Sequence, residues 1–433
     1  MKYKLRERFY LGSKLPPKGP IRVIGGGIAG LLTGFFLQQR GYDFEIIERA
    51  ERPGGLLGTQ QLERGLAEQA ANGFLWSPEV QALCDALKLP LLAPQPSAKK
   101  RFLVRGQKLH RFPLRFLESI VLLGRALWPH RQTLQTASDF GRVYFGDAFA
   151  QQVLSPGLAG IYGANADQLS FPGALSPVAR MLNRSDFLPL AVWRHRRAQP
   201  KAPGGKRPVG THGFAGGMAD LIDALQERLH AHLRLGVDGL QYRDSTDYLI
   251  LTTPAHVSQH FFSGPLAERL ARIAYTPLLS TTVLLERTQL PRFREGFGCL
   301  IPRSEGLHSL GVLFNSCIFP QRSRDPKLLS LTAILRQDES YPDLLARSDA
   351  DIATLLKEDL SRLFGFSGDF AEQAIFRWPR AIPIYSPALY QSWPELDRLL
   401  RAQYPQRQLF GNYTGQISVR GMCEAATREI GTA

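Results

Sequence analysis

The glycine-rich stretch that follows residue 20 constrains the fold of this chain more than any other feature. An apolar strand, 21–24, runs into Gly25, Gly27 and Gly30, which have the spacing Gly-x-Gly-x-x-Gly. In dinucleotide-binding folds the first glycine makes a tight turn, the second lets a pyrophosphate approach the backbone, and the third lets a helix pack closely on the strand. The apolar residues that follow predict a helix over 28–40, whose N-terminal amides would face the pyrophosphate.

A second strand and a second glycine pair extend this pattern. The strand 44–47 is followed by Glu48, at the distance along the chain expected for a carboxylate that binds ribose hydroxyls. Gly54 and Gly55 would then let the backbone pass close to a longer dinucleotide, which favours FAD over NAD. Three glycines alone also occur in ordinary turns, where Glu48 would merely be solvated. The complete order of strand, turn, helix, strand and acid therefore carries the prediction of a nucleotide site.

Length and charge narrow the class of protein and of partner. The chain has 433 residues, enough for two or three domains with their own cores. Lys and Arg number 53 against 38 Asp and Glu, and the resulting net charge of +15 predicts an anionic substrate or an anionic membrane surface as partner. We expect no nucleic acid, because no nucleic-acid-binding motif accompanies the charge.

The cysteines and the termini bear on the compartment. Cys84, Cys299, Cys317 and Cys423 have no metal-ligand or CxxC spacing, so we expect reduced, mostly buried thiols, no metal site and a cytoplasmic protein. The basic N-terminal residues lack the apolar run of a signal peptide. We also expect no membrane-spanning segment, because no apolar stretch is long enough.

Two segments each allow two interpretations. Residues 99–110 predict a strand pair around a turn at Gly106 and Gln107, and their cations form either a solvated face or an anion site. Residues 114–128 are unusually apolar and end on Trp128, which is consistent with either a buried helix or a helix that lies in a membrane interface.

Later segments give further expectations. The apolar run 248–254 predicts a strand that is buried on both faces and returns to the first sheet. Strand patterns between 281 and 314 indicate a second sheet, and helices are expected at 350–363 and 394–401. His212 is the nearest candidate for a general base, but a lone histidine in a turn is more often structural.

The order of these segments resembles the oxygen-dependent protoporphyrinogen oxidase family of the flavin amine oxidase superfamily, over nearly the whole chain after residue 20. The motifs that carry the resemblance are Arg101-Phe102-Leu103 with Leu109-His110 and Pro113, Gly160-Ile161-Tyr162-Gly163-Ala164 with Leu169-Ser170, Gly296-Phe297-Gly298 with Ile301-Pro302-Arg303-Ser304-Glu305 and Phe319-Pro320, Trp378-Pro379-Arg380-Ala381-Ile382-Pro383-Ile384-Tyr385, and Gly411-Asn412-Tyr413 with Ser418-Val419.

The resemblance implies a mixed α/β fold with several domains. A Rossmann-type FAD-binding domain would comprise residues 21–95, 205–270 and 401–433. A β-sheet substrate domain, 271–400, would be interleaved with it. Residues 96–204 would form a substrate-binding and helical domain that docks on a membrane.

The resemblance also implies which residues bind the ligands. FAD would be held by Gly25, Gly26, Gly27, Ile28, Ala29, Gly30, Glu48, Arg49, Gly54, Gly55, Trp378, Gly411, Asn412, Tyr413, Ile417 and Ser418. The substrate would be bound by Arg101, on a propionate of a tetrapyrrole, and by Tyr162, Gly163 and Phe314.

The activity that the resemblance implies is FAD-dependent oxidation of a porphyrinogen to the porphyrin in heme biosynthesis, with oxygen as acceptor. The donor would be protoporphyrinogen IX or coproporphyrinogen III, from which a hydride passes to flavin N5. The protein would lie in the cytoplasm, peripheral to the cytoplasmic membrane, and a homodimer is a further expected arrangement.

Departures from the family pattern keep two other hypotheses open. The region 237–248 is short where relatives carry a hairpin, and Gln416 stands where a second glycine is common. The first alternative is a non-catalytic or weakly FAD-binding protein of the same fold that binds tetrapyrroles or a protein partner. The second is a flavin oxidase that acts on another substrate.

Overall fold

The computed structural model describes residues 3, 5, 8–16, 19–112, 132–198 and 210–431. The described residues form two compact units. The parallel-sheet unit takes its residues from 7–94, 210–275 and 391–433, and the antiparallel-sheet unit from 1–6, 95–209 and 276–390. The domain boundaries expected from the sequence stay a prediction.

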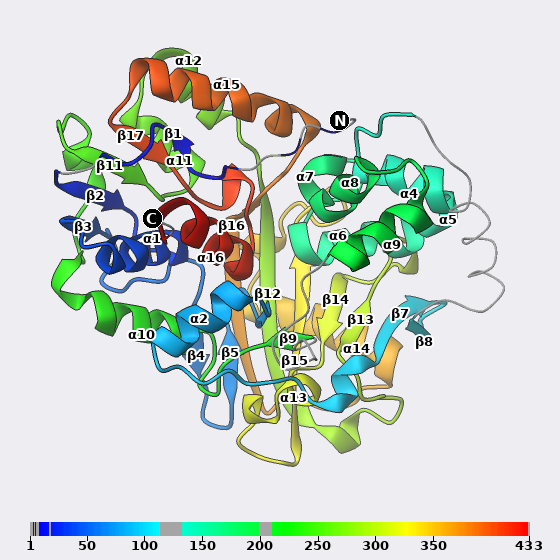
Figure 1. The fold of residues 1–433 in the computed structure, drawn as a ribbon. Coiled ribbons are helices and arrows are strands. Elements are labelled where there is room, and N and C mark those ends of the chain that lie inside the picture. Colours follow the sequence, from blue (N-terminus) through cyan, green and yellow to red (C-terminus); the bar gives the residue numbers. More distant parts are fainter. Residues whose placement is uncertain are drawn as a thin grey trace. The chain divides into compact units, whose positions relative to one another are not determined.

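The parallel-sheet unit is built on a six-stranded sheet (Figure 1). Its strands, in spatial order, are β1 (Leu11–Gly12), β17 (Arg407–Leu409), β11 (Tyr248–Leu251), β2 (Ile21–Ile24), β3 (Phe44–Ile47) and β10 (Leu233–Arg234). All neighbours from β17 to β10 are parallel, and β1 is antiparallel to β17. Numbered along the chain from β2, the parallel strands have the order 3-2-1-4-5 of doubly wound nucleotide-binding sheets.

Helix α1 (Ile28–Gln39) is the helix predicted after the glycine turn. It is apolar on all sides and is buried from Ala29 to Leu37, as expected for a helix covered by other elements all round. Its neighbours are β2 and β3 of the sheet and the helices α10 (Ala219–Leu229) and α16 (Val419–Ala426). A Cβ added to Gly34 would lie 2.5 Å from Ile46 Cδ1, so this helix approaches the sheet as closely as glycine allows.

The other elements of this unit surround the sheet. They are α2 (Pro78–Ala86), α11 (Ala255–Ser258), α12 (Gly264–Ala271), α15 (Pro387–Gln403, from residue 391 on) and two small sheets, β4 (Thr59–Gln61) with β5 (Leu66–Glu68) and β6 (Phe74–Leu75) with β9 (Thr211–His212). Ser77 accepts a hydrogen bond from Val80 N and begins α2, with Pro78 in the first turn. The predicted bounds of the helix 394–401 were wrong, because α15 begins seven residues before Pro394, at Pro387, and ends at Gln403.

Strand β1 was not predicted from the sequence. Leu11 and Gly12 pair with Leu409 and Gln408 at the edge of the sheet. Beside them, the ring of Tyr10 stacks on Phe410 at 4.0 Å between centroids. Its hydroxyl lies 2.7 Å from Thr33 Oγ1 on α1. The N-terminal segment therefore belongs to the core of this unit.

The antiparallel-sheet unit contains a seven-stranded sheet. Its strands, in spatial order, are β16 (Glu372–Pro383), β12 (Tyr275–Glu286), β15 (Leu328–Arg336), β14 (Ser309–Leu313), β13 (Gly298–Leu300), β7 (Arg101–Arg105) and β8 (Lys108–Phe112). Strands β7 and β8 form the predicted hairpin around Gly106 and Gln107. Strand β7 is parallel to β13, whereas the pairs from β13 through β14 and β15 to β12 are antiparallel.

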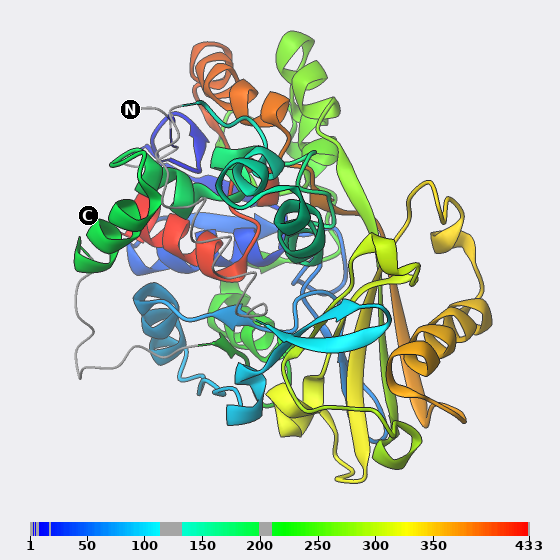
Figure 2. The same cartoon turned by 90° about the vertical axis from the view of Figure 1, so that its right-hand side faces the viewer.

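Helices cover this sheet. Helix α14 (Asp349–Phe364) begins at Ser348, which forms a capping box with Asp351, and ends at Gly365 with φ +74°. Its apolar side packs on Leu331, Leu335 and their neighbours at one face of the sheet, beside the yellow strands in Figure 2. A second group comprises α4 (Ala137–Phe145), α5 (Asp147–Phe149), α6 (Ser155–Tyr162), α7 (Phe171–Ala174), α8 (Ser176–Leu182) and α9 (Leu188–Ala198), and the short α13 (Asn315–Ile318) follows β14.

The mixed α/β fold class expected from the sequence is confirmed by these two sheets and their helices. The apolar segment 114–128 lies outside the described residues. Among the helices that the structure does describe, none combines the length and the apolar character needed to cross a membrane.

The packing of Tyr10 leads to a stability prediction. Replacing Tyr10 with Phe removes the hydroxyl contact with Thr33 and should cost about 1 kcal/mol, because Thr33 keeps its hydrogen bond to Ala29 O. Replacing Tyr10 with Ala also removes the stacked ring and should cost about 3–5 kcal/mol. Urea unfolding followed by circular dichroism should give midpoints in the order wild type, Tyr10→Phe, Tyr10→Ala. Equal midpoints for wild type and Tyr10→Ala would show that the N-terminal segment does not stabilise this unit.

Candidate functional site

A cavity of about 350 Å³ lies at the carboxyl ends of four parallel strands. It is lined by Ile24 at the end of β2, Ile47 at the end of β3, Thr252 after β11 and Gly411 after β17. Strands β2 and β11 are neighbours at the point where the strand order reverses. Open α/β sheets bind ligands at this switch point, outside the carboxyl ends of the strands.

The first glycine turn forms one wall of the cavity. Gly25 has φ +110°, and its N–H donates to Ile47 O at 2.8 Å. A Cβ at Gly30 would lie 1.9 Å from Gly25 O, so only glycine fits there. At Gly27, which caps α1, a Cβ would meet nothing nearer than Gly55 Cα at 3.9 Å. Its missing side chain therefore leaves open space rather than relieving a clash.

The second glycine pair lies directly against the first turn. Gly54 N donates to Gly26 O at 2.8 Å, and Gly27 and Gly54 form a parallel bridge. Gly54 and Gly55 have φ +114° and +60°, values that side chains other than glycine rarely adopt. The two segments thus meet backbone to backbone and leave a wall of peptide groups.

Glu48 is held beside the glycine turn by backbone amides. Its Oε2 accepts from Gly26 N at 2.6 Å, and its Oε1 accepts from Ala50 N at 2.8 Å. The carboxylate also lines the cavity. Because each carboxylate oxygen has two lone pairs, both can accept a further bond from a ligand hydroxyl.

Thr252 and Thr253 line the cavity but were missed from the sequence. Thr252 Oγ1 lies 2.9 Å from Ile24 O and 2.8 Å from Gly25 O, so its hydroxyl ties β11 to the glycine turn. The signal was present, since both residues directly follow a buried strand that was expected to return to the first sheet. In such a sheet the residue after each strand faces the ligand crevice.

The short region between 237 and 248 also contributes to the cavity. It forms a 3₁₀ helix, Gly239–Tyr242, which begins at Asp238. Asp238, Gly239 and Leu240 all line the cavity. This short segment thus supplies part of the wall of the cavity.

The predicted cofactor residues divide into three groups. Those that line the cavity are Gly25, Gly27, Ile28, Ala29, Glu48, Arg49, Gly54, Gly55, Gly411 and Asn412. Those that belong to the same unit but do not line the cavity are Gly26, Gly30, Tyr413, Ile417 and Ser418, of which Tyr413 is fully buried and Ser418 caps α16. Trp378 lies on β16 of the antiparallel-sheet unit, and its place near a flavin stays a prediction.

A second cavity, of about 310 Å³, lies in the antiparallel-sheet unit. Its lining includes residues of β7, β13, β14 and α6, together with Ile334 of β15. Because side chains alternate along a strand, Ile334 lies on the face of the sheet opposite to that of Leu335, which belongs to the core. Arg101 is the one ionised side chain among its described lining residues, and the guanidinium lies 4.8 Å from the centroid of the Phe297 ring. In its described part, the cavity therefore combines an apolar lining with the guanidinium of Arg101.

The other three predicted substrate residues do not line this cavity. Phe314 is completely buried in the core between the sheet and α14. The hydroxyl of Tyr162 donates to Ala174 O at 3.0 Å, and burial raises its pKa to about 12. Gly163 ends α6 with φ +64°. Their roles in substrate binding stay predictions. Of the four predicted substrate residues, Arg101 is the one that lines this cavity.

His212 is the nearest candidate for a general base in the sequence. It lies on β9, is 5% exposed, and its Nδ1 is 3.2 Å from Gly210 O. Burial lowers the pKa of His212 below its usual value, an effect that the bond to Gly210 O partly opposes. It does not line either of the two cavities described above.

The parallel sheet, the glycine turn and the acid after β3 are the features of a doubly wound nucleotide-binding fold. The chain belongs to the flavin containing amine oxidoreductase family, whose model matches residues 28–429. Membership indicates a flavin cofactor and an oxidoreductase.

Similar proteins cover almost the whole chain. The chain is 26% identical over 469 residues to protoporphyrinogen oxidase 2, chloroplastic/mitochondrial, of Arabidopsis thaliana, with 92% of this chain and 90% of that protein covered. It is 28% identical over 447 residues to coproporphyrinogen III oxidase of Mycobacterium bovis, with 94% and 96% covered. A crystal structure of a putative protoporphyrinogen oxidase from an Exiguobacterium species matches with a TM-score of 0.77 and 18% identity over 96% of this chain and 98% of that one.

The open space at Gly27 gives a test of the cofactor cradle. We expect Gly27→Ala to fold normally, because its φ of −67° is ordinary and, apart from its neighbours in the chain, the nearest atom to the new methyl group is Gly55 Cα at 3.9 Å. The methyl group would nevertheless occupy the cradle and weaken flavin binding at least about tenfold, a cost of about 1.4 kcal/mol. The measurement is bound flavin per protein after dialysis.

Gly160→Ala is the matched control, because its new methyl group would also find only ordinary contact, at 3.6 Å from Leu300, in the other unit. Equal flavin content in both variants would contradict the assignment of the cradle.

His212 gives a pH prediction. Because burial lowers its pKa in the folded state, unfolding takes up a proton below about pH 6.5, and the stability present above that pH is lost as the pH falls. His212→Gln lacks this titration. Its thermal midpoint should therefore fall less than that of the wild type between about pH 7.5 and about pH 5.5. An identical fall in both proteins would show that His212 titrates alike in the folded and unfolded chains.

Proposed function

We propose that the protein is an FAD-dependent oxidase that converts a porphyrinogen to the porphyrin. The observation that carries the proposal is the cavity in which Arg101 is the single cation on an otherwise apolar lining, among the residues described there. Relatives over more than 90% of the chain are named for oxidation of protoporphyrinogen and of coproporphyrinogen III. A porphyrinogen is an apolar macrocycle with carboxylate arms, which matches that lining.

FAD is the proposed flavin. Gly27, Gly54 and Gly55 leave the space and peptide groups that a pyrophosphate needs at the start of α1, where the helix dipole favours negative charge. Glu48 would accept hydrogen bonds from the ribose hydroxyls. The backbone N–H groups of Gly26 and Ala50 already hold its two carboxylate oxygens in place. When bound, the flavin supplies two-electron oxidation of the substrate.

The chain's own residues would bind and orient the two ligands. Gly411 and Asn412 follow β17 at the cavity, and we propose that this turn and Trp378 contact the flavin end of the cofactor. Arg101 would hold a propionate by charge-assisted hydrogen bonds, while the apolar walls exclude water from the ring. A porphyrinogen is oxidised easily and needs no general base, and we therefore assign none.

Oxygen is the proposed acceptor, and an anionic membrane surface is the proposed site of attachment from the cytoplasm, with a homodimer as the proposed assembly. The net charge of +15 supports the membrane proposal, because basic surfaces are attracted to anionic lipids. We propose protoporphyrinogen or coproporphyrinogen III as the substrate. The two differ in their number of carboxylates, and Arg101 is the residue that we propose binds a carboxylate, so it is the residue to test.

The substrate proposal predicts the effect of removing Arg101. Arg101→Ala should lower kcat/KM for protoporphyrinogen by about 10–100-fold, since a lost charged hydrogen bond costs about 1.5–3 kcal/mol. Its flavin content should stay at the wild-type value, because Arg101 lies outside the cofactor cavity. Lys108→Ala is the control, a cation on the neighbouring strand of the same hairpin that does not line the cavity. Equal activity of Arg101→Ala and Lys108→Ala would remove Arg101 from the substrate site.

A further inference from the structure

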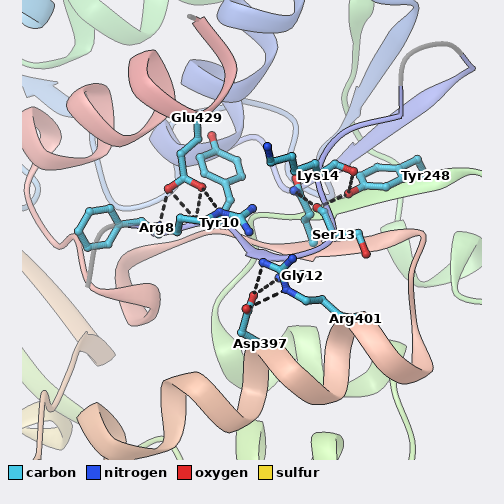
Figure 3. A network of polar contacts seen from close by, with 11 residues as sticks. Arg8, Tyr10, Gly12, Ser13, Lys14, Tyr248, Asp397, Arg401 and Glu429 are labelled. Carbon is cyan, nitrogen blue, oxygen red and sulfur yellow. Dashed lines mark hydrogen bonds and ion pairs between the residues drawn. The ribbon is translucent and has the colours of Figure 1, made fainter. Parts of the chain in front are cut away.

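The N-terminal segment 8–16 forms a strap along the edge of the parallel sheet (Figure 3). One end of the strap is held by Glu429, near the C-terminus. The Glu429 carboxylate accepts from Phe9 N, from Tyr10 N at 3.2 Å and from Arg8 Nε at 3.4 Å. The Glu429 side chain is only 9% exposed. Its charge is therefore already compensated by the strap.

The other end of the strap is held at three further points. Gly12 N donates to Asp397 Oδ1 at 2.7 Å, and the Tyr248 hydroxyl lies 2.8 Å from Ser13 O and 3.2 Å from Lys14 O. Gln408 Nε2 also donates to Ser13 O. These bonds fix the backbone on both sides of Tyr10, so the side chains of Arg8 and Lys14 start from defined positions.

A cavity of about 540 Å³ opens beside the strap. Four cations line it, and we call them the basic groove: Arg8, Lys14, Arg40 and Arg428. Glu429 is the one carboxylate among the described residues of its lining, and it is the group that already accepts the strap's donors. The groove shares no lining residue with the flavin cavity of the same unit. It is therefore a separate site.

Neutral groups orient two of the cations of the groove, whereas Arg8 is paired with Glu429. Arg40 Nη1 donates to Ile430 O at 3.0 Å, and the guanidinium of Arg428 lies 5.2 Å from the Phe9 ring centroid. In the part of the chain that the structure describes, neither Lys14 nor Arg40 has a carboxylate within ion-pair distance. Lys14 extends toward the side of the strap where Tyr10 and Glu429 lie (Figure 3). Among the residues that the structure describes, the groove thus gathers four cations around one carboxylate, Glu429.

We propose that the basic groove binds a phosphate-bearing anion. A phosphate group carries up to two negative charges and several acceptor oxygens, which arginine forks and a lysine ammonium bind by charge-assisted hydrogen bonds. Binding also relieves the repulsion among the four cations. The phosphate belongs either to a soluble molecule or to the headgroup of an anionic lipid, and both present the same chemistry to the groove.

The test uses flavin-loaded protein, so that the cofactor cavity is filled. One arm titrates inorganic pyrophosphate by isothermal calorimetry. The other measures flotation with vesicles of phosphatidylcholine, with or without phosphatidylglycerol. The variants are Lys14→Gln, whose exposed side chain can be changed while its backbone bond to Tyr248 remains, and Lys14→Gln combined with Arg428→Gln.

Arg272→Gln is the control, a cation with 80% side-chain exposure on the same unit and outside the groove. We expect Lys14→Gln to weaken binding of the responding probe by about tenfold, the double variant to weaken it further, and Arg272→Gln to leave it unchanged. Loss of pyrophosphate binding identifies a soluble phosphate, and loss confined to phosphatidylglycerol vesicles identifies a lipid headgroup. Failure of wild-type protein to bind either probe would overturn the proposal, as would equal binding by Lys14→Gln and Arg272→Gln.

Discussion

The contact between the two glycine segments is the constraint on which the rest of the parallel-sheet unit depends. Gly54 N donates to Gly26 O, and Gly27 faces Gly55 with only backbone between them. A Cβ at Gly27 would enter the open space of the cavity, and Gly54 and Gly55 have positive φ values that residues with a Cβ rarely adopt. The parallel strands, the buried α1 and the threonine that ties β11 to the turn all hold these two backbone segments in place.

Much of this unit could be predicted from the sequence, because its information is local. The strands 21–24 and 44–47 and the helix between them were expected within a residue or so of their observed bounds. Strand β1 could not be predicted, since two residues have no periodicity and their place depends on pairing with β17, almost the whole chain away. The helix expected at 394–401 begins at a proline, because proline is tolerated in the first turn of a helix but disfavoured in its interior. Helix α15 nevertheless contains Pro394 in its interior.

The candidate sites divide in the same way. Residues within the glycine motifs reach the cavity as the motif spacing predicts, whereas Thr252 and Asp238 are brought there by the order of strands in the sheet. Arg101 lines the second cavity, as the proposed substrate site requires, but Phe314 is buried in the core against α14, a position that no local sequence pattern reveals. One cavity lies at the glycine turns of the parallel sheet, and the other combines an apolar lining with Arg101, the one cation among its described lining residues.

The most direct test of this account is the visible absorption spectrum of the purified protein during anaerobic addition of protoporphyrinogen, with coproporphyrinogen III in a parallel experiment. The account predicts a bound-flavin spectrum that bleaches in proportion to one of the two donors, as the flavin takes up their electrons. A flavin spectrum that neither donor changes would contradict the proposed substrate class. Failure to bind flavin after FAD is supplied would contradict the assignment of the cradle itself.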